Sequence, residues 1–125
     1  MEPDEALRGR RILVVEDDYL VAQSISEVLR AAGAEVSGPI GWIDEAVDFI
    51  EHHASAIDSA VVDINLHGEK SYQIADALTR SGIWFMFTTG YDTEEVSAPY
   101  QDYPRCIKPF QAPALIAMLA PSSKQ

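Results

Sequence analysis

Two kinds of hydrophobic segment alternate along the chain. Continuous apolar runs of strand length occur five times, and the stretches between them mostly repeat apolar residues every three or four positions, as one face of a helix does. The predicted strands cover residues 11–16, 35–40, 57–64, 83–89 and 105–108. The predicted helices cover residues 20–32, 43–50, 74–78 and 112–119. The pattern therefore predicts strand–helix units repeated along the chain.

Glycine and proline mark where the predicted helices end. Gly33 follows the first helix and Gly82 follows the third, which are typical positions for helix termination. Residues 93–100 favour only a short helix, because Pro99 ends it. Parallel strands need crossover connections, which place helices against the sheet. The fold class expected is α/β, a doubly wound five-stranded parallel sheet with helices on both faces and the flavodoxin-like strand order 2-1-3-4-5.

Length, charge and composition narrow the class of protein. The 125 residues suffice for one domain, which we expect over residues 8–121, with loose termini at 1–7 and 122–125. The net charge of −11 disfavours nucleic acid and anionic lipid as partners. No apolar run is long enough for a membrane helix and the first residues do not resemble a signal peptide, so we expect a cytoplasmic protein. The single cysteine, Cys106, excludes an internal disulfide and is expected to be a small buried hydrophobe.

Polar residues follow the predicted strands at the edge of the sheet where ligands bind in this fold class. In doubly wound sheets the crevice lies beyond the carboxyl ends of the strands, where the strand order reverses. Strands one and three are neighbours there, so Asp63 should lie beside Glu16 and Asp17. The residues at these strand ends are Glu16, Asp17, Asp18, Asp63, Thr88, Thr89 and Lys108.

The acidic residues of this group suggest a cation site. Crowded carboxylates either take up a proton or hold a cation between them, and oxygen ligands with room for water suit Mg²⁺. A bound Mg²⁺ would neutralise an incoming phosphoryl group, so that a carboxylate could attack phosphorus. Lys108 could balance the remaining charge, and the Thr89 hydroxyl could donate to a phosphoryl oxygen. Together these residues indicate a phosphoryl-accepting aspartate.

Each residue also has an ordinary structural explanation. Asp17 or Asp18 could cap the first helix, and Asp63 could be a solvated loop acid. The two threonines could be β-branched strand residues, and Lys108 could be a surface charge. Only their joint placement at four strand ends favours a functional site.

Four motifs carry a resemblance to a known family. In order they are "ILVVEDD", "VVDIN", "TTGY" and "KPF", and with them the chain resembles the receiver domain of bacterial response regulators over about residues 10–120. The resemblance implies that Asp63 is the phosphoacceptor, which takes a phosphoryl group from a phosphohistidine on a sensor histidine kinase or a phosphotransfer protein. It implies a Mg²⁺ site at Asp63 in which Asp17 is a direct ligand, Glu16 acts through water and Asn65 offers its backbone carbonyl.

The same resemblance assigns the other strand ends. Thr89 looks like the hydroxyl residue that follows the phosphoryl group on activation, and Lys108 looks like the family's amine. Pro109 would then follow Lys108 through a cis bond. Thr88 would be a neighbour of Thr89 with its side chain on the other face of the strand.

One position departs from the family pattern. Three residues before the lysine the family usually carries Tyr or Phe, whose inward turn couples phosphorylation to the output face, and here the residue is Arg105. The stretch "FTTGY" is similar to the Phe-Ala-Thr-Gly-Tyr stretch of a subclass that lacks this aromatic and is often paired with histidine kinases of the HWE or related type. The hypothesis is that Tyr91 and the segment after it, through residue 102, carry the conformational change instead.

The function expected from the sequence is signalling rather than catalysis on other molecules. A stand-alone receiver would catalyse only its own phosphorylation and dephosphorylation, and would bind an unknown protein target or act as a phosphate sink. A receiver-like interaction module that is not phosphorylated is one alternative. A Mg²⁺-dependent phosphohydrolase is another, although Asn65 stands where such enzymes typically carry a second acid.

Overall fold

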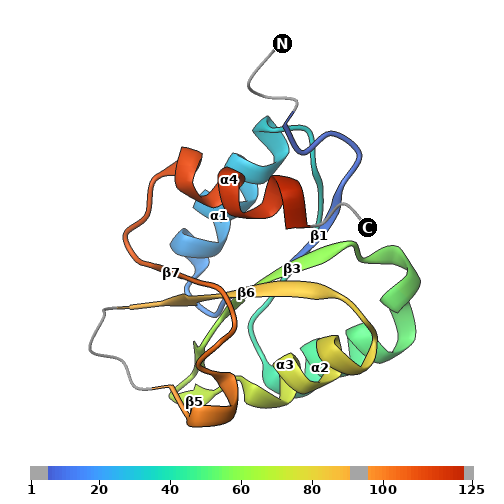
Figure 1. Ribbon diagram of the computed structural model, residues 1–125, viewed down its shortest axis with the longest axis vertical. Coiled ribbons are helices and arrows are strands. Elements are labelled where there is room, and N and C mark those ends of the chain that lie inside the picture. The colour runs from blue at the N-terminus through green and yellow to red at the C-terminus, as the bar shows by residue number, and fades with distance from the viewer. Residues whose placement is uncertain (1–5, 91–95, 123–125) are drawn as a thin grey trace.

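The computed structural model describes residues 6–90 and 96–122 and forms a parallel sheet between two layers of helices (Figure 1). Its strands are β1 (Arg11–Val15), β2 (Glu35–Ile40), β3 (Ser59–Asp63), β4 (Asn65–Leu66), β5 (Glu69–Lys70), β6 (Trp84–Thr89) and β7 (Arg105–Ile107). Its α-helices are α1 (Tyr19–Ala31), α2 (Ile43–His53), α3 (Tyr72–Arg80) and α4 (Ala112–Ser122), and short 3₁₀ turns form η2 (Ala54–Ala56) and η3 (Ala98–Tyr100).

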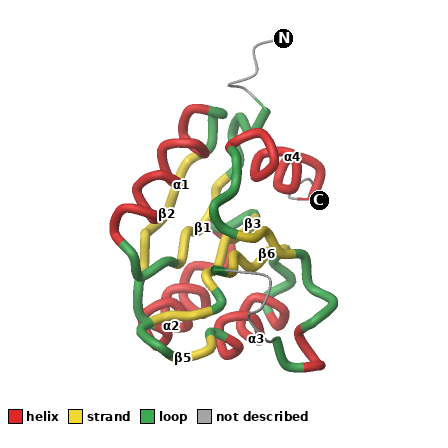
Figure 2. The backbone as a smooth tube through the Cα atoms, turned by 90° about the vertical axis from the view of Figure 1, so that its left-hand side faces the viewer, coloured by secondary structure: helices red, strands yellow, loops and turns green. Residues whose placement is uncertain are grey.

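The four parallel pairings confirm the predicted sheet. The strand order is β2-β1-β3-β6-β7 and every neighbouring pair is parallel, which is the 2-1-3-4-5 order when the short β4–β5 pair is left aside. Helices α1 and α4 lie on one face of the sheet, and α2 and α3 lie on the other (Figure 2). Strands β1 and β3 are therefore adjacent at the point where the strand order reverses.

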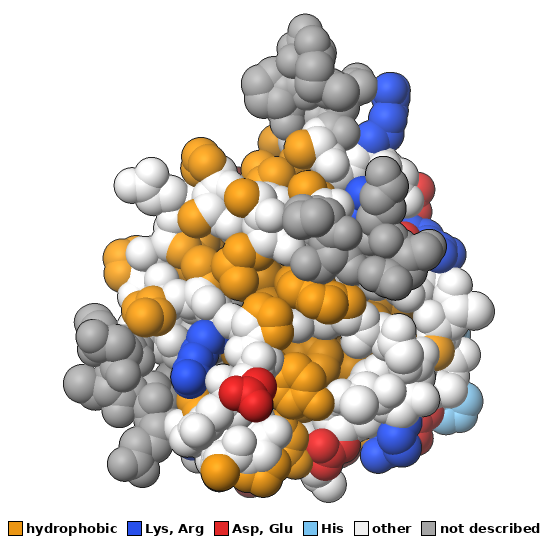
Figure 3. Space-filling view, in the orientation of Figure 1, with side chains coloured by type: hydrophobic (Ala, Val, Ile, Leu, Met, Phe, Trp, Pro, Cys, Tyr) orange, Lys and Arg blue, Asp and Glu red, His pale blue; other side chains and the backbone are white. Residues whose placement is uncertain are grey.

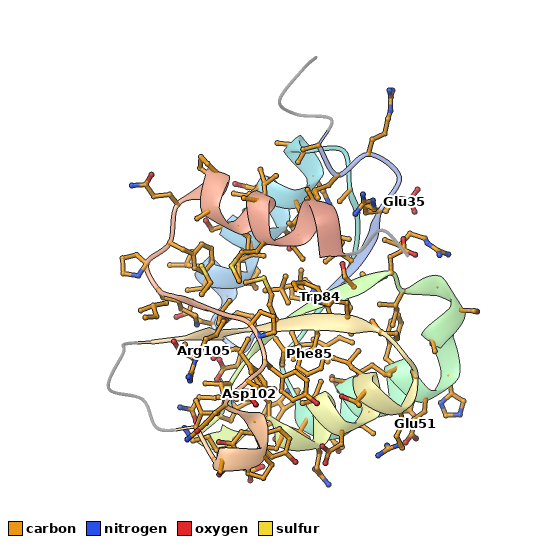
Figure 4. All side chains as sticks on the ribbon, viewed as in Figure 1. Glu35, Glu51, Trp84, Phe85, Asp102 and Arg105 are labelled. Carbon is orange, nitrogen blue, oxygen red and sulfur yellow. The ribbon has the colours of Figure 1, made fainter. Side chains whose placement is uncertain are left out.

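Two hydrophobic clusters, one on each face, hold the helices to the sheet. Alternate residues of a strand point to opposite faces. Leu13 therefore belongs to the cluster between the sheet and helices α2 and α3, called here the α2/α3 cluster, and Val14 belongs to the cluster between the sheet and helices α1 and α4, the α1/α4 cluster. The same alternation separates Phe85 from its neighbour Trp84 on β6 (Figure 4). All five residues of β3 are buried, which explains why that segment reads as a continuous apolar run rather than an alternating one.

The structure corrects two expectations about local elements and adds one element that was not predicted. Leu7, expected in a loose terminus, is fully buried and its N–H donates to the Ala32 carbonyl at 2.8 Å, because it fills the end of the α1/α4 cluster. Of the short helix expected over residues 93–100, residues 93–95 lie outside the described residues; Pro99 lies near the start of η3 and not at the end of a helix, and its missing N–H costs nothing there. The small antiparallel pair β4–β5 was not predicted, because two-residue strands leave no periodic signal.

Aromatic contacts hold the segment after residue 95 to α3. The rings of Tyr72 and Tyr100 stack with centroids 4.2 Å apart, and the Tyr72 hydroxyl accepts the Ser97 N–H at 2.9 Å. The Tyr100 hydroxyl donates to both oxygens of Asp76, at 3.0 and 3.2 Å. Residues 96–103 therefore lie beside α3, whereas Tyr91, which carries the switch hypothesis, lies outside the described residues.

A charged pair at the opposite edge of the sheet gives a stability prediction. Asp58 accepts from the backbone N–H, Nε and Nη2 of Arg11 at 2.8, 3.2 and 2.9 Å, and the side-chain bond to Arg11 lowers the pKa of the carboxyl group. A lowered pKa gives stability that is present above the carboxyl pKa of the unfolded chain and is lost as pH falls through the folded value. Because Arg11 is partly exposed, Asp58→Asn should lower the free energy of unfolding by only about 1 kcal/mol at neutral pH, with the difference shrinking in acid. Urea unfolding, with Asp102→Asn as an exposed control, measures it; an equal loss at low pH would contradict the assignment.

Candidate functional site

Three strands of the sheet deliver charged side chains to one place. Glu16 and Asp17 follow β1, Asp63 is the last residue of β3, and Lys108 follows β7. The carboxyl ends of parallel strands share one edge, and here β3 lies between β1 and β6. The Glu16 N–H also continues the β1–β2 pairing by donating to the Ile40 carbonyl at 2.9 Å, which fixes where the chain leaves the sheet. The sequence-predicted acids and the lysine are thus brought together.

Lys108 bridges two buried carboxylates. Its Nζ donates to Glu16 Oε1 at 2.9 Å and to Asp63 Oδ2 at 3.0 Å, from a side chain with about a fifth of its surface exposed. Burial alone would lower the pKa of Lys108, but the hydrogen bond to Glu16 and the charges of Asp63 and Glu16 outweigh it and raise that pKa. The amine therefore stays charged and balances one of the acids.

Glu16 is the acid whose ionisation the fold opposes most. Its side chain is almost completely buried, and this desolvation, reinforced by Asp63, raises the pKa of Glu16 to about 8 in spite of Lys108. Its second oxygen, Oε2, accepts the Asp18 N–H at 3.1 Å. At neutral pH and without a cation, Glu16 therefore holds a proton for much of the time.

The two aspartates after Glu16 have different roles. Asp18 is the N-cap of α1, because its Oδ1 accepts the N–H groups of Leu20 and Val21 at 3.0 and 3.2 Å. Asp17 does not cap the helix; its Oδ2 accepts the His67 N–H at 2.8 Å. The capping explanation that the sequence left open thus applies to Asp18, and Asp17 is left for the charged cluster.

Asp63 is held in position by the chain that follows it. Its Oδ1 accepts the Asn65 N–H at 3.0 Å, and its backbone carbonyl accepts the Ser71 hydroxyl at 2.7 Å. With 6% of its surface exposed, Asp63 is not the solvated loop acid of the alternative explanation. Ser71, fully buried, is a contributor that the sequence analysis missed, since a lone serine before a helix reads as a cap.

The acidic cluster has the ligands that a hard cation needs. Glu16, Asp17 and Asp63 each offer a carboxylate oxygen, and these oxygens lie within 4.8 Å of one another. Three carboxylates beside the single positive charge of Lys108 leave the ionised cluster negative, and burial followed by the contact with Asp63 raises the pKa of Glu16. Carboxylate oxygens with space for water are the ligands that Mg²⁺ takes in proteins, so these residues fit that ion.

The two threonines at the end of β6 occupy different positions. Asp63 pairs in register with Thr88, and the Thr88 carbonyl accepts the Ile64 N–H at 3.0 Å. The Thr88 hydroxyl is completely buried and has no hydrogen-bond partner among the described residues. Thr89 is the last residue of the strand, and its carbonyl accepts the Lys108 N–H at 2.7 Å. Both threonines therefore lie next to the charged cluster.

The edge strand β7 carries the residue that departs from the family pattern. Arg105 is exposed at the start of β7 (Figure 4), and Cys106, its neighbour, is half-buried against the α1/α4 cluster, which raises the pKa of the thiol through burial. The peptide bond between Lys108 and Pro109 is cis, as expected, and a second cis bond precedes Pro39. The inward-turning aromatic ring is thus replaced by an exposed guanidinium.

An apolar groove opens beside Lys108. It has a volume of about 490 Å³ and runs between the first turns of α1 and the loop that follows β7. Next to it, Tyr19 and Leu20 at the start of α1 are each 73% exposed, which is unusual for large hydrophobic residues. The lining residues are Leu20, Val21, Ser24, Ile25, Gly90, Lys108, Pro109 and Phe110.

Several solved structures are similar to most of the chain. The solution structure of SdrG from Sphingomonas melonis Fr1 has 33% identical residues and a TM-score of 0.79, with 89% of this chain and 93% of that chain covered. A BeF₃-activated conformation of SdrG is 35% identical, with a TM-score of 0.72 and coverage of 87% and 95%. The receiver domain of the hybrid histidine kinase CckA is 26% identical, with a TM-score of 0.71 and coverage of 86% and 94%.

Curated relatives match over a shorter stretch. The transcriptional regulatory protein PdtaR from Mycobacterium tuberculosis is 35% identical over 62 residues, which is 50% of this chain and 29% of PdtaR. The chain thus spans about a third of the length of the curated relatives it matches. No family model matches the chain.

Proposed function

Because the chain belongs to the receiver domains of response regulators, a family of signalling proteins, we propose that it accepts a phosphoryl group on Asp63. The observation that carries the proposal is the contact of Lys108 Nζ with both Glu16 and Asp63 at the carboxyl end of the sheet. It supports a carboxylate whose charge is partly balanced by Lys108 and which lies among other acids, largely removed from bulk water.

The roles of the chain's own residues follow from their charges. Asp63 is the nucleophile, and Lys108, which stays protonated, reduces the repulsion between its carboxylate and an incoming phosphoryl group. Asp17, Glu16 and Asp63, with the backbone carbonyl of Asn65, would hold Mg²⁺. When bound, Mg²⁺ supplies the positive charge that offsets the phosphoryl oxygens.

The phosphodonor is expected to be a protein that presents a phosphohistidine. Lys108 lines the apolar groove, and the exposed rings and side chains at the start of α1 lie beside it. A sensor histidine kinase or phosphotransfer protein that packs an apolar surface there would bring its histidine close to Asp63. We propose this groove as the docking surface for that partner, including kinases of the HWE type.

A second surface suits a downstream protein. Hydrophobic side chains gather across the middle of the face that carries β6 and β7 (Figure 3). Ile107 is 47% exposed, and a groove of about 390 Å³ that includes Trp84, Phe85 and Tyr103 opens near the start of β6. We propose that phosphorylation is transmitted through protein contact at this face.

No helix in the described part of the chain is long and apolar enough to cross a membrane.

The proposal is tested by exposing the protein to a small phosphodonor. With acetyl phosphate and Mg²⁺, intact mass should show the gain of one phosphoryl group, and a metal chelator should prevent it. Beryllofluoride with Mg²⁺ should shift amide signals around residues 63 and 88–90 in NMR spectra. If neither reagent has an effect at saturating Mg²⁺, the chain is not a working receiver and a pure interaction module becomes the better explanation.

The two threonines give a separate prediction. Thr89→Val should slow phosphorylation by acetyl phosphate about a hundredfold, the lower end of what loss of a single transition-state donor costs, because the hydroxyl contact to the phosphoryl group would be lost. Thr88→Val should leave that rate within about twofold and raise the free energy of unfolding by about 1 kcal/mol, since it removes a buried hydroxyl without a described partner. Phosphorylation rates and urea unfolding distinguish them; the reverse pattern would assign the hydroxyl role to Thr88.

A further inference from the structure

The β4–β5 hairpin places its tip beside the acidic cluster. Asn65 pairs with Lys70 and Leu66 with Glu69, so the turn consists of His67 and Gly68 alone. Both turn residues have positive φ, 51° and 85°, as a tight two-residue hairpin turn requires. His67 is the only described residue other than glycine with positive φ, and such a conformation costs free energy that a contact elsewhere has to offset.

Asp17 lies between this tip and the loop that leads into α2. The His67 N–H donates to Asp17 Oδ2 at 2.8 Å. A Cβ placed on Gly41 would lie 3.4 Å from the Cα of Asp17, so the loop before α2 packs directly against the backbone of that residue. Asp17 is thus contacted by two loops that are far apart in the sequence.

A ring stack joins the two loops to each other. The residue after Gly41 is Trp42, whose ring lies parallel to the His67 imidazole, with centroids 3.6 Å apart and an angle of 11° between the planes. Trp42 is 53% exposed, so it contributes far less to the core than a buried tryptophan would. The two loops that contact Asp17, through the His67 N–H and through Gly41, are thus also joined to each other by the ring stack.

We propose that the Trp42–His67 stack is a positioning device for Asp17. By holding the hairpin tip, it keeps the His67 N–H on Oδ2 and leaves Oδ1 of the carboxylate available to a cation. Neither ring is a metal ligand; both act through Asp17, as groups behind a ligand commonly do. The inference rests on the proposed Mg²⁺ role of the acidic cluster.

The test compares three Mg²⁺ titrations, each followed by amide NMR shifts in wild type, Trp42→Ala and Trp42→Phe. Loss of a group that orients a ligand typically weakens metal binding tenfold or more, so Trp42→Ala should raise the Kd for Mg²⁺ about tenfold. Trp42→Phe keeps a flat ring over His67 and should stay within about twofold. Without Mg²⁺, the His67 N–H should exchange with solvent faster in Trp42→Ala than in wild type.

His67→Gly provides a second variant if Trp42→Ala does not fold. Glycine keeps the N–H and accepts the positive φ but removes the ring, and with it both the stack and the Nδ1 atom that lies 3.9 Å from Asp17 Oδ2. It should therefore weaken Mg²⁺ binding at least as much as Trp42→Ala does, and adding Trp42→Ala to it should cause no further loss. Unchanged Mg²⁺ affinity in the alanine and glycine variants, or equal weakening by Trp42→Phe, would overturn the positioning role. A wild-type protein that shows no Mg²⁺-dependent shift would instead overturn the Mg²⁺ proposal, and the positioning role with it.

Discussion

Asp63→Asn is expected to abolish phosphorylation by acetyl phosphate while leaving the protein folded. The amide has no anionic oxygen to attack phosphorus, whereas its carbonyl can still accept from Lys108 or Asn65, the two groups that now contact the carboxylate side chain. Loss of one charge from a cluster of three acids also relieves repulsion. We therefore expect a free energy of unfolding at or above that of wild type, together with complete loss of the mass gain.

Intact mass after incubation with acetyl phosphate and Mg²⁺ measures this effect directly. Asp48→Asn makes the same chemical change on an exposed side chain of α2 and should be phosphorylated like wild type. A phosphoryl group that persists in Asp63→Asn would place the acceptor on another residue, and peptide mapping would identify it. Loss of phosphorylation in both variants would point to a defect other than removal of the nucleophile.

The fold could be predicted from the sequence because its signals are strong and local. Continuous apolar runs such as residues 11–16 mark strands that the helices cover, and helical spacing such as that of Ile25 and Leu29 marks the faces that bury them. Parallel strands with short connections leave few possible topologies, and the observed order is the one predicted. The periodic pattern could not show that Leu7 is buried, because a single apolar residue outside a helix or strand has no period.

The candidate site, too, could be predicted only in part. Glu16, Asp17, Asp63 and Lys108 could be placed together because strand ends converge in this fold, and the structure does bring them together. Contacts made by backbone atoms could not be foreseen, since the His67 N–H that holds Asp17 depends on a turn conformation and not on the identity of the side chain. The position of Trp42, which is half-exposed, could not be predicted for the same reason: its partner is the tip of a hairpin that leaves no periodic pattern in the sequence.

The second large effect is expected from the raised pKa of Glu16. The ionised form of Glu16, which a cation would bind, lowers the stability of the folded protein. Desolvation by burial, with Asp63 adding to it, raises the pKa from 4.5 to about 8, so between these values the folded protein binds more protons than the unfolded chain. Stability contributed by this group is therefore complete in acid and is lost as pH rises toward and through 8. Since one pKa unit corresponds to about 1.4 kcal/mol, the cost of the ionised carboxylate is on the order of a few kcal/mol at pH 9.

Glu16→Gln should accordingly be more stable than wild type at pH 9, by about 2 kcal/mol, in the absence of divalent cations. At pH 5 the Glu16 carboxyl group is protonated and uncharged in wild type as well, so the two proteins should agree to within about 1 kcal/mol. Urea unfolding at both pH values, with a chelator present, measures the two differences in the free energy of unfolding.

Saturating Mg²⁺ should stabilise wild type at pH 9 and stabilise Glu16→Gln much less, since one charge of the cation cluster is gone. If the two proteins lose stability equally between pH 5 and pH 9, the fold does not oppose ionisation of Glu16; if Mg²⁺ stabilises both equally, Glu16 is not part of the cation site.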